Sequence, residues 1–122
     1  MPFKVKEEYY AVVIEISGKF LGAIEGEAFR QTIEQLKEAG KVHVVIDLSK
    51  ADLLDSSAIG LLISSLATMR RAGGDVRLAG MQKRVRNLFL MTRLLGPVFT
   101  NYETVEEAVN SFEEQPEAPT DA

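Results

Sequence analysis

The chain has 122 residues, of which 46% are hydrophobic and 26% charged, and it carries a formal net charge of −4 with no cysteine. This length and apolar content fit one domain with one core. The missing thiols exclude disulfides, thiolate metal sites and cysteine nucleophiles, and the sequence pI of about 5.0 argues against direct binding of nucleic acid.

No targeting or membrane segment is expected. The longest apolar stretches fall far short of the ~20 residues that span a bilayer. Residues 1–4 also lack the apolar region of a secretory signal. We therefore expect a soluble, cytoplasmic protein that does not bind a membrane.

The first elements alternate between strand and helix. Residues 10–17 are predicted to form an apolar strand that ends at Gly18, and residues 3–6 a shorter strand that pairs with it. Residues 24–39 are predicted to form an amphipathic helix, because apolar residues recur on one of its faces. Residues 42–48 are almost wholly apolar, which is typical of a strand covered on both sides.

The clearest helix is predicted over residues 56–72, and a pair of glycines ends it. Its buried face should consist of Ile59, Leu62, Ile63, Leu66 and Met69. The shorter elements expected after it are a strand over 75–79, a helix over 82–91, a strand at 98–99 and a helix over 104–113 that opens with a capping box.

Strands that alternate with helices predict an α/β fold. We expect one domain over residues 1–112, with an open, mixed, mostly parallel sheet and about four helices. Residues 113–122 hold four acids, no base and no large apolar residue, so they should form a disordered acidic tail. Without this tail the charges balance, at 14 basic and 14 acidic residues.

Two features of the sequence, its single histidine and a basic stretch, could carry chemistry. His43, the only histidine, lies in the 42–48 strand without acids or cysteines spaced for a metal, so we assign it a structural role and expect no metal or cofactor. Residues 70–93 carry seven basic residues against one acid, Asp75. They form either solvated helix faces and turns or a surface for an acidic or nucleotide-bearing partner.

The most informative segment joins the 42–48 strand to the 56–72 helix. The strand reads Val-Val-Ile-Asp-Leu, with its acid at Asp47, and the helix opens with Asp55-Ser56-Ser57-Ala58-Ile59-Gly60. A serine at a helix N-terminus is a good cap, and the free N–H groups there also accept a phosphate. From these residues alone, Asp55 and the serines are either helix caps or a phosphate-accepting site.

The whole pattern resembles the STAS domain family, and in particular its stand-alone bacterial anti-sigma factor antagonists. The resemblance covers residues 8–112. Its signature is a strand of the form V-x-x-D-L, followed by D-S-[ST]-G-[LI]-G at the start of a helix, with further matches at Gly18-Lys19 and Gly80. The chain departs from the family pattern at Ala58, where a glycine is usual, and in the segment ending at Gly22, where an acid is usual.

This resemblance implies a phosphorylation switch. Ser56, the first serine of the pair, would be phosphorylated by an anti-sigma factor that is a GHKL-type serine kinase, and a PP2C-like phosphatase would reset the cycle. In such partner switching the unphosphorylated antagonist binds the anti-sigma factor, and the sigma factor is released. The residues implied in partner binding are Asp47, Asp55, Ser56, Ser57, Ala58 and Gly22.

Three other functions are possible for a chain of this length and pattern. A response-regulator receiver needs an acidic pair after its first strand, and none follows residue 17. We expect no enzyme, since a G-x-S-x-G elbow and a phosphate loop with G-K-[ST] are both missing from the sequence. The third interpretation stays within the family: an adaptor that is not phosphorylated, as in lipid ABC-transport complexes or stressosome-like scaffolds.

Overall fold

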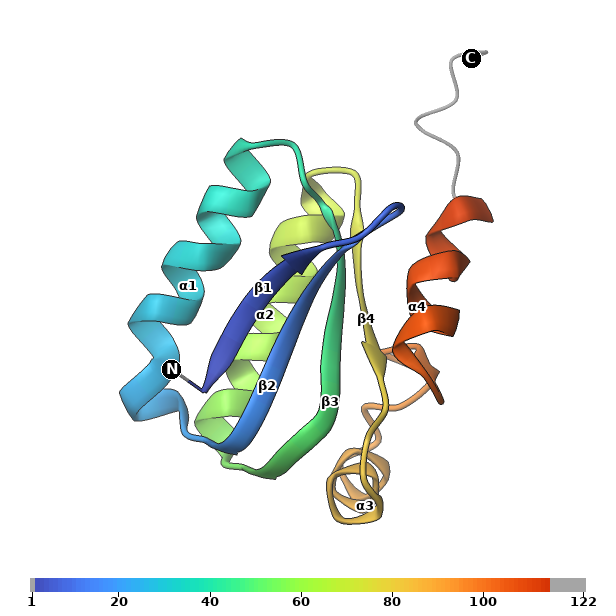
Figure 1. The fold of residues 1–122 in the computed structure, drawn as a ribbon. Coiled ribbons are helices and arrows are strands. Elements are labelled where there is room, and N and C mark those ends of the chain that lie inside the picture. Colours follow the sequence, from blue (N-terminus) through green and yellow to red (C-terminus); the bar gives the residue numbers. More distant parts are fainter. Residues whose placement is uncertain (1, 115–122) are drawn as a thin grey trace.

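The fold is built on a five-stranded sheet, and the computed structural model describes it with its helices over residues 2–114 (Figure 1). The strands follow one another in sequence order across the sheet. Only the first strand runs antiparallel to its neighbour, so the predicted mixed, mostly parallel sheet is confirmed. The strands are β1 (Phe3–Glu7), β2 (Val12–Phe20), β3 (His43–Leu54), β4 (Asp75–Ala79) and β5 (Asn101–Tyr102).

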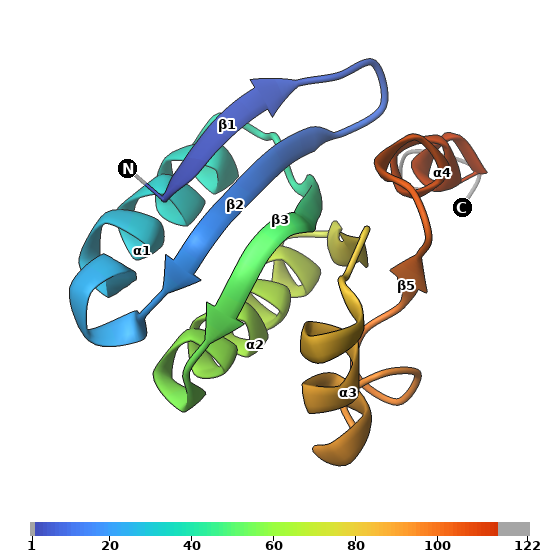
Figure 2. The same cartoon turned by 60° about the horizontal axis from the view of Figure 1, so that its bottom comes forward.

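The helices divide between the two faces of the sheet. Figure 2 shows α1 and α2 side by side behind β1, β2 and β3, whereas α4 lies apart from them beside β5. A single 3-10 turn, Phe112–Glu114, follows α4. The helices are α1 (Gly22–Glu38), α2 (Ser56–Arg71), α3 (Lys83–Met91) and α4 (Val105–Ser111).

Side-chain alternation along the strands separates two clusters of buried residues. Ile14 and Ile46 face α1 and α2 and belong to the larger cluster, whereas Val13 and Val45 face α4 and belong to the smaller one. Of the predicted stripe on α2, Ile59, Leu62, Leu66 and Met69 are buried. The prediction for Ile63 was wrong, because this side chain lies at the edge of the stripe and is 38% exposed.

The two central strands are longer than predicted. β2 continues past Gly18 to Phe20, and β3 continues to Leu54. Gly18 does not end the strand: its φ of 65° lies at an irregularity where the pairing of β2 with β3 shifts register. The added length of β3 carries the chain to the start of α2.

The last strand was misplaced. Phe99 makes only an isolated bridge with Leu95 and is fully buried, with its ring 5.9 Å from that of Phe89. The strand lies three residues further along the chain than predicted, at Asn101–Tyr102, and the capping box of α4 is present at Thr104. Of the acidic tail predicted over residues 113–122, positions 113 and 114 belong to the 3-10 turn, and residues 115–122 lie outside the described residues.

Polar and aromatic contacts fasten the end of α4 to the sheet. The Arg77 guanidinium lies 4.0 Å from the centre of the Phe112 ring and donates to the Ser111 hydroxyl at 2.7 Å. The His43 ring stacks on Phe112 with a centroid distance of 4.8 Å. Arg77 also pairs with Asp75 at 3.0 Å. These contacts support the structural role predicted for His43 and give Arg77, from the basic stretch, a structural role as well.

Candidate functional site

The predicted serine pair lies at the carboxyl end of β3, where the chain turns directly into α2 (Figure 1). We call residues 55–58 the serine turn. Leu54, the last residue of β3, is buried and anchors this turn to the core. Asp55 has an extended backbone and is the N-cap of α2, whose first two residues are Ser56 and Ser57. Both serines are exposed, so both are accessible to another molecule.

The Asp55 carboxylate ties the starts of two helices together. Its Oδ1 accepts a hydrogen bond from the N–H of Gly22 in α1 at 3.0 Å and one from the N–H of Ala58 in α2 at 2.8 Å. The bond from Gly22, and then that from Ala58, hold the pKa of Asp55 below its usual range, because both favour the ionised form. Asp55 is thus a helix cap that also fixes the serine turn against α1.

Gly22 permits this close approach because it has no side chain. A Cβ built at Gly22 would lie 2.3 Å from the Cβ of Ser57 and 2.6 Å from its carbonyl carbon, which no real pair of atoms tolerates. The first turn of α1 therefore rests directly on the first turn of α2. Gly22, expected at a partner surface, is buried in this contact between helices.

Ala58 is placed differently from the serines beside it. Its side chain is fully buried and belongs to the core cluster under α1 and α2. The methyl group that replaces the usual glycine hydrogen therefore points into the protein. Its backbone N–H, which donates to Asp55, is the part of Ala58 that contributes to the serine turn.

Asp47 does not join the serine turn. It lies in the middle of β3 on the face that carries α4, is 7% exposed, and accepts a hydrogen bond from the N–H of Ser49 at 2.9 Å. The strand between Asp47 and Asp55 spans on the order of 20 Å. The structure thus brings Asp55, both serines and Gly22 together and leaves Asp47 apart from them.

A cleft follows the contact between α1 and α2 and begins at the serine turn. We call it the α1–α2 cleft; its lining residues are Gly22, Ala23, Arg30, Ser57, Gly60, Leu61 and Ser64. The α2 residues in this set repeat with helical spacing and form one stripe. Ser56 is not among them, because adjacent residues of a helix point about 100° apart. The two serines therefore face different directions.

Exposed apolar side chains flank the serine turn. Ile24, in the first turn of α1, is 71% exposed, and Leu53, two residues before Asp55, is 43% exposed. Leu53 also lines a groove between β3 and α3 together with Met91, which is 82% exposed. Apolar groups left in water near one another are typical of surfaces that bind other proteins.

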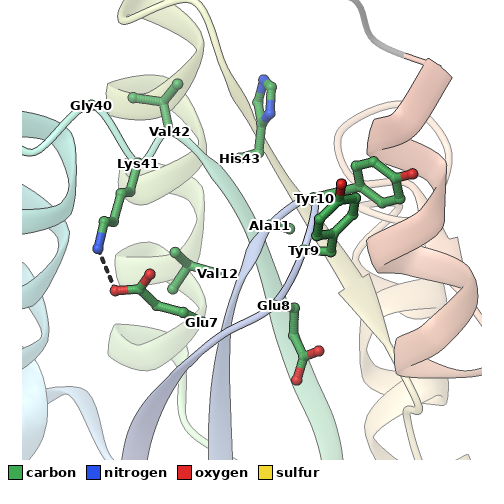
Figure 3. Close-up of a pocket in the computed structure, with 10 residues that line it drawn as sticks. All are labelled: Glu7, Glu8, Tyr9, Tyr10, Ala11, Val12, Gly40, Lys41, Val42 and His43. Atoms are coloured by element: carbon green, nitrogen blue, oxygen red, sulfur yellow. Dashed lines mark hydrogen bonds and ion pairs between the residues drawn. The ribbon is translucent and has the colours of Figure 1, made fainter.

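Another pocket lies at the opposite end of the sheet (Figure 3). It is formed by the hairpin between β1 and β2 and by the segment that leads into β3, and Lys41 pairs with Glu7 beside it. It adjoins the amino end of β3, whereas the serines follow the carboxyl end. It is therefore no part of the serine site.

Residues 2–114 lack two features that would have indicated other functions. This part of the chain holds no group of three or more histidine, cysteine, aspartate or glutamate side chains that could bind a metal ion. It also contains no helix with the length and apolar character needed to cross a bilayer.

Sequence reasoning missed two parts of the site. The bond from Gly22 to Asp55 joins residues 33 positions apart, and no local pattern announces it. Arg30 was not singled out, since it lies on the long 24–39 helix among other charged residues. The one available signal was Gly26, a glycine inside a helix four residues before it.

The fold and the serine turn together define a class of protein. The sequence profile of the STAS domain matches residues 3–108, and the chain belongs to this family. A protein of Thermotoga neapolitana, named as a TM1081 homologue and a candidate anti-sigma factor antagonist, is 24% identical over 113 residues, which cover 92% of this chain and 96% of that one.

Solved structures have the same fold. The crystal structure of TM1081 from Thermotoga maritima, also a candidate anti-sigma factor antagonist, has a TM-score of 0.82 at 18% identity and covers 91% of this chain and 94% of that one. The Bacillus cell fate determinant SpoIIAA in its phosphorylated form has a TM-score of 0.71 at 22% identity, covering 89% and 97% of the two chains.

Proposed function

We propose that this chain is an anti-sigma factor antagonist, a regulatory protein of the cytoplasm and not an enzyme, whose partner binding is controlled by phosphate on Ser56. The observation that carries the proposal is an exposed serine at the first position of α2, on a turn that Asp55 fixes to both long helices. The names of the relatives and the phosphorylated form of SpoIIAA support it.

The partner in this proposal is an anti-sigma factor that is also a GHKL-type serine kinase. The unphosphorylated chain binds it and thereby frees the sigma factor. The kinase then phosphorylates Ser56 and releases the chain, and a PP2C-like phosphatase restores the binding form. The exposed side chains of Ile24, Leu53 and Met91 give the partner apolar surface on both sides of the serine turn.

The charge of a phosphate explains how such a switch can work. Phosphorylation adds about −1.5 to −2 charges at neutral pH. On Ser56 this charge would lie next to the Asp55 carboxylate, and the surface around the turn would become strongly anionic. A partner that presents acidic groups is then repelled, and each ~1.4 kcal/mol of repulsion lowers its affinity tenfold.

The choice of Ser56 over Ser57 also has a structural argument. The Cβ of Ser57 packs on the backbone of Gly22, at the bottom of the contact between α1 and α2. Ser56 is not a lining residue of the α1–α2 cleft. A kinase active site therefore has a more open approach to the Ser56 hydroxyl.

The test is phosphopeptide mass spectrometry after incubation with ATP and the serine kinase encoded beside this chain's gene. Ser56→Ala should abolish phosphate incorporation and keep partner binding, whereas the matched control Ser57→Ala should still be phosphorylated. Ser56→Asp should bind the partner more weakly. Phosphate found only on Ser57 would refute the residue assignment. No phosphate at all, with binding unaffected by Ser56→Asp, would instead favour the adaptor.

A further inference from the structure

Arg30 holds its charge above the backbone of Gly26 in the α1–α2 cleft. A Cβ built at Gly26 would lie 3.2 Å from Nη2 of Arg30 and 3.7 Å from its Cζ. The guanidinium therefore occupies the space that a side chain at position 26 would need. Helical side chains lean toward the N-terminus of their helix, so this one reaches back toward the start of α1.

The Arg30 guanidinium has no ion pair or hydrogen bond with any other residue in the described range 2–114. Two acids are within helical reach of it, Glu27 three residues before and Glu34 four residues after. Glu34 pairs with Lys37 instead. Among the described residues that line the α1–α2 cleft, Arg30 alone is charged. The cleft thus contains a positive charge that no acid among residues 2–114 neutralises by direct contact.

This charge lies close to Ser57. Gly26 lies four residues after Gly22 on α1, a rise of about 6 Å, and the Cβ of Ser57 packs directly on Gly22. The guanidinium therefore lies within about 12 Å of the Ser57 Cβ along the cleft. A phosphate on Ser57 would extend into this interval, where the long Arg30 side chain can meet it.

Ser56 has a different relation to Arg30. It is not a lining residue of the cleft, and its side chain points about 100° away from that of Ser57 around α2. The Asp55 carboxylate lies beside both serines, so its charge does not distinguish them. Arg84 of α3 lies on the other side of the turn, in a groove that it lines with Leu53 and Leu54 and that includes neither serine. The position of Arg30 in the cleft beside Ser57 is therefore the difference that we consider between the two sites.

We infer that Arg30 gives the two serines opposite electrostatic outcomes: a phosphate on Ser57 pairs with Arg30 inside the cleft, whereas a phosphate on Ser56 stays unpaired. This inference rests on the proposed function and deepens it. A phosphate carries about −1.5 to −2 charges, so the single positive charge of Arg30 offsets roughly half of it at position 57. Only the phosphate on Ser56 presents its full charge to a partner, so Ser56 is the stronger repulsive switch.

The test places phosphoserine at position 56 or 57 of the full chain by genetic code expansion, so it needs no kinase. Phosphorus NMR then follows the second ionisation of each phosphate. The midpoint at position 57 should lie about 0.2–0.7 pH units below that at position 56. Arg30→Gln should remove this difference. The control Arg71→Gln, which changes an exposed arginine at the far end of α2, should preserve it.

A second readout is the Nε–H signal of Arg30 in nitrogen NMR spectra, which should move with phosphate on Ser57 and remain in place with phosphate on Ser56. Equal midpoints, or an Arg30→Gln effect of the same size at both positions, would overturn the inference. So would a chain that unfolds when phosphoserine occupies position 57. Failure of any kinase to modify Ser56 would refute the proposed function and leave these titrations unchanged.

Discussion

Two carboxylates, one on each face of the sheet, are held by different means. On the side of α1 and α2, Asp55 accepts hydrogen bonds from two backbone N–H groups that belong to helices. On the opposite face, Glu15 is only 4% exposed and lies 3.4–3.6 Å from three ammonium groups. These groups belong to Lys4, Lys6 and Lys50.

The difference is one of rigidity. Backbone donors are fixed by their helices, so the geometry around Asp55 can change only if α1 and α2 move apart. The three lysine side chains are long, flexible and at least half exposed. Water or another lysine can therefore take the place of any one of them beside Glu15. Burial raises the pKa of Glu15. The lysines, Lys50 first, lower that pKa by a larger amount, so it lies below its usual range. The serine turn is thus held by the rigid kind of contact.

The largest effect should come from removing the apolar support of the rigid side. Leu62 is fully buried on α2, and Leu62→Ala should lower the free energy of unfolding by about 2–5 kcal/mol, because the cavity left behind cannot collapse fully. Urea denaturation measures this loss. Ile63→Ala, one residue along the same helix at a side chain that is 38% exposed, should cost less than about 1 kcal/mol. Equal losses would show that α2 is not packed as described.

The next effect concerns the contact between the helix starts. Gly22→Ala should cost about 1–3 kcal/mol, because the new methyl group forces α1 away from Ser57. Gly60→Ala is the matched control: a Cβ there meets nothing within 4 Å, and the change should be neutral or stabilise α2 by up to about 1 kcal/mol. Thermal unfolding of both variants distinguishes them. A Gly22→Ala protein as stable as the control would contradict the close approach.

Acid should weaken the Asp55 contact. Because the pKa of Asp55 is lower in the folded protein than in the unfolded chain, its stabilisation is complete above the ordinary carboxyl pKa and is lost as the pH falls through the lowered value. The free energy of unfolding should therefore decline between about pH 5 and pH 2 less steeply in Asp55→Asn than in the wild type. Glu15→Gln, which removes the other carboxyl with a lowered pKa, should flatten the decline as well. An unchanged slope in Asp55→Asn would mean that Asp55 gains nothing from its ionised form.

The smallest effect should be that of a single lysine over Glu15. Lys50→Gln should cost less than about 1 kcal/mol, since two further ammonium groups remain. Even this loss should shrink in 1 M salt, where charges are screened beyond about 3 Å. The cost of Gly22→Ala is steric and should not change with salt. If salt changed the costs of Lys50→Gln and Gly22→Ala equally, the distinction between the two faces would be wrong.

Local patterns explain what could be predicted from the sequence. α2 was predicted over residues 56–72 and found at Ser56–Arg71, because its apolar residues repeat with helical period over four turns. The serine turn was equally accessible, since a cap and its helix are neighbours in sequence. The exposed Ile63 shows the limit: a stripe read from spacing has no sharp edge, and packing against the sheet decides where it stops.

The second half of β3 could not be predicted for a specific reason. Burial there falls on Leu48, Ala51 and Leu54, every third residue, while a regular strand buries every second one. Register shifts against β2 cause this spacing. The contact of Asp55 with Gly22 and the placing of Arg30 depend in the same way on how α1 packs against α2, which neither helix encodes alone.

The order of the strands also affects whether the protein aggregates at high concentration. The two outer strands of the sheet are β1 and β5. Three of the five positions of β1 carry a charge, and β5 is only two residues long. Charged side chains on an edge strand, and a very short edge strand, both hinder a strand of a second molecule from pairing with the sheet. At high concentration this chain should therefore stay dispersed rather than grow into fibrils.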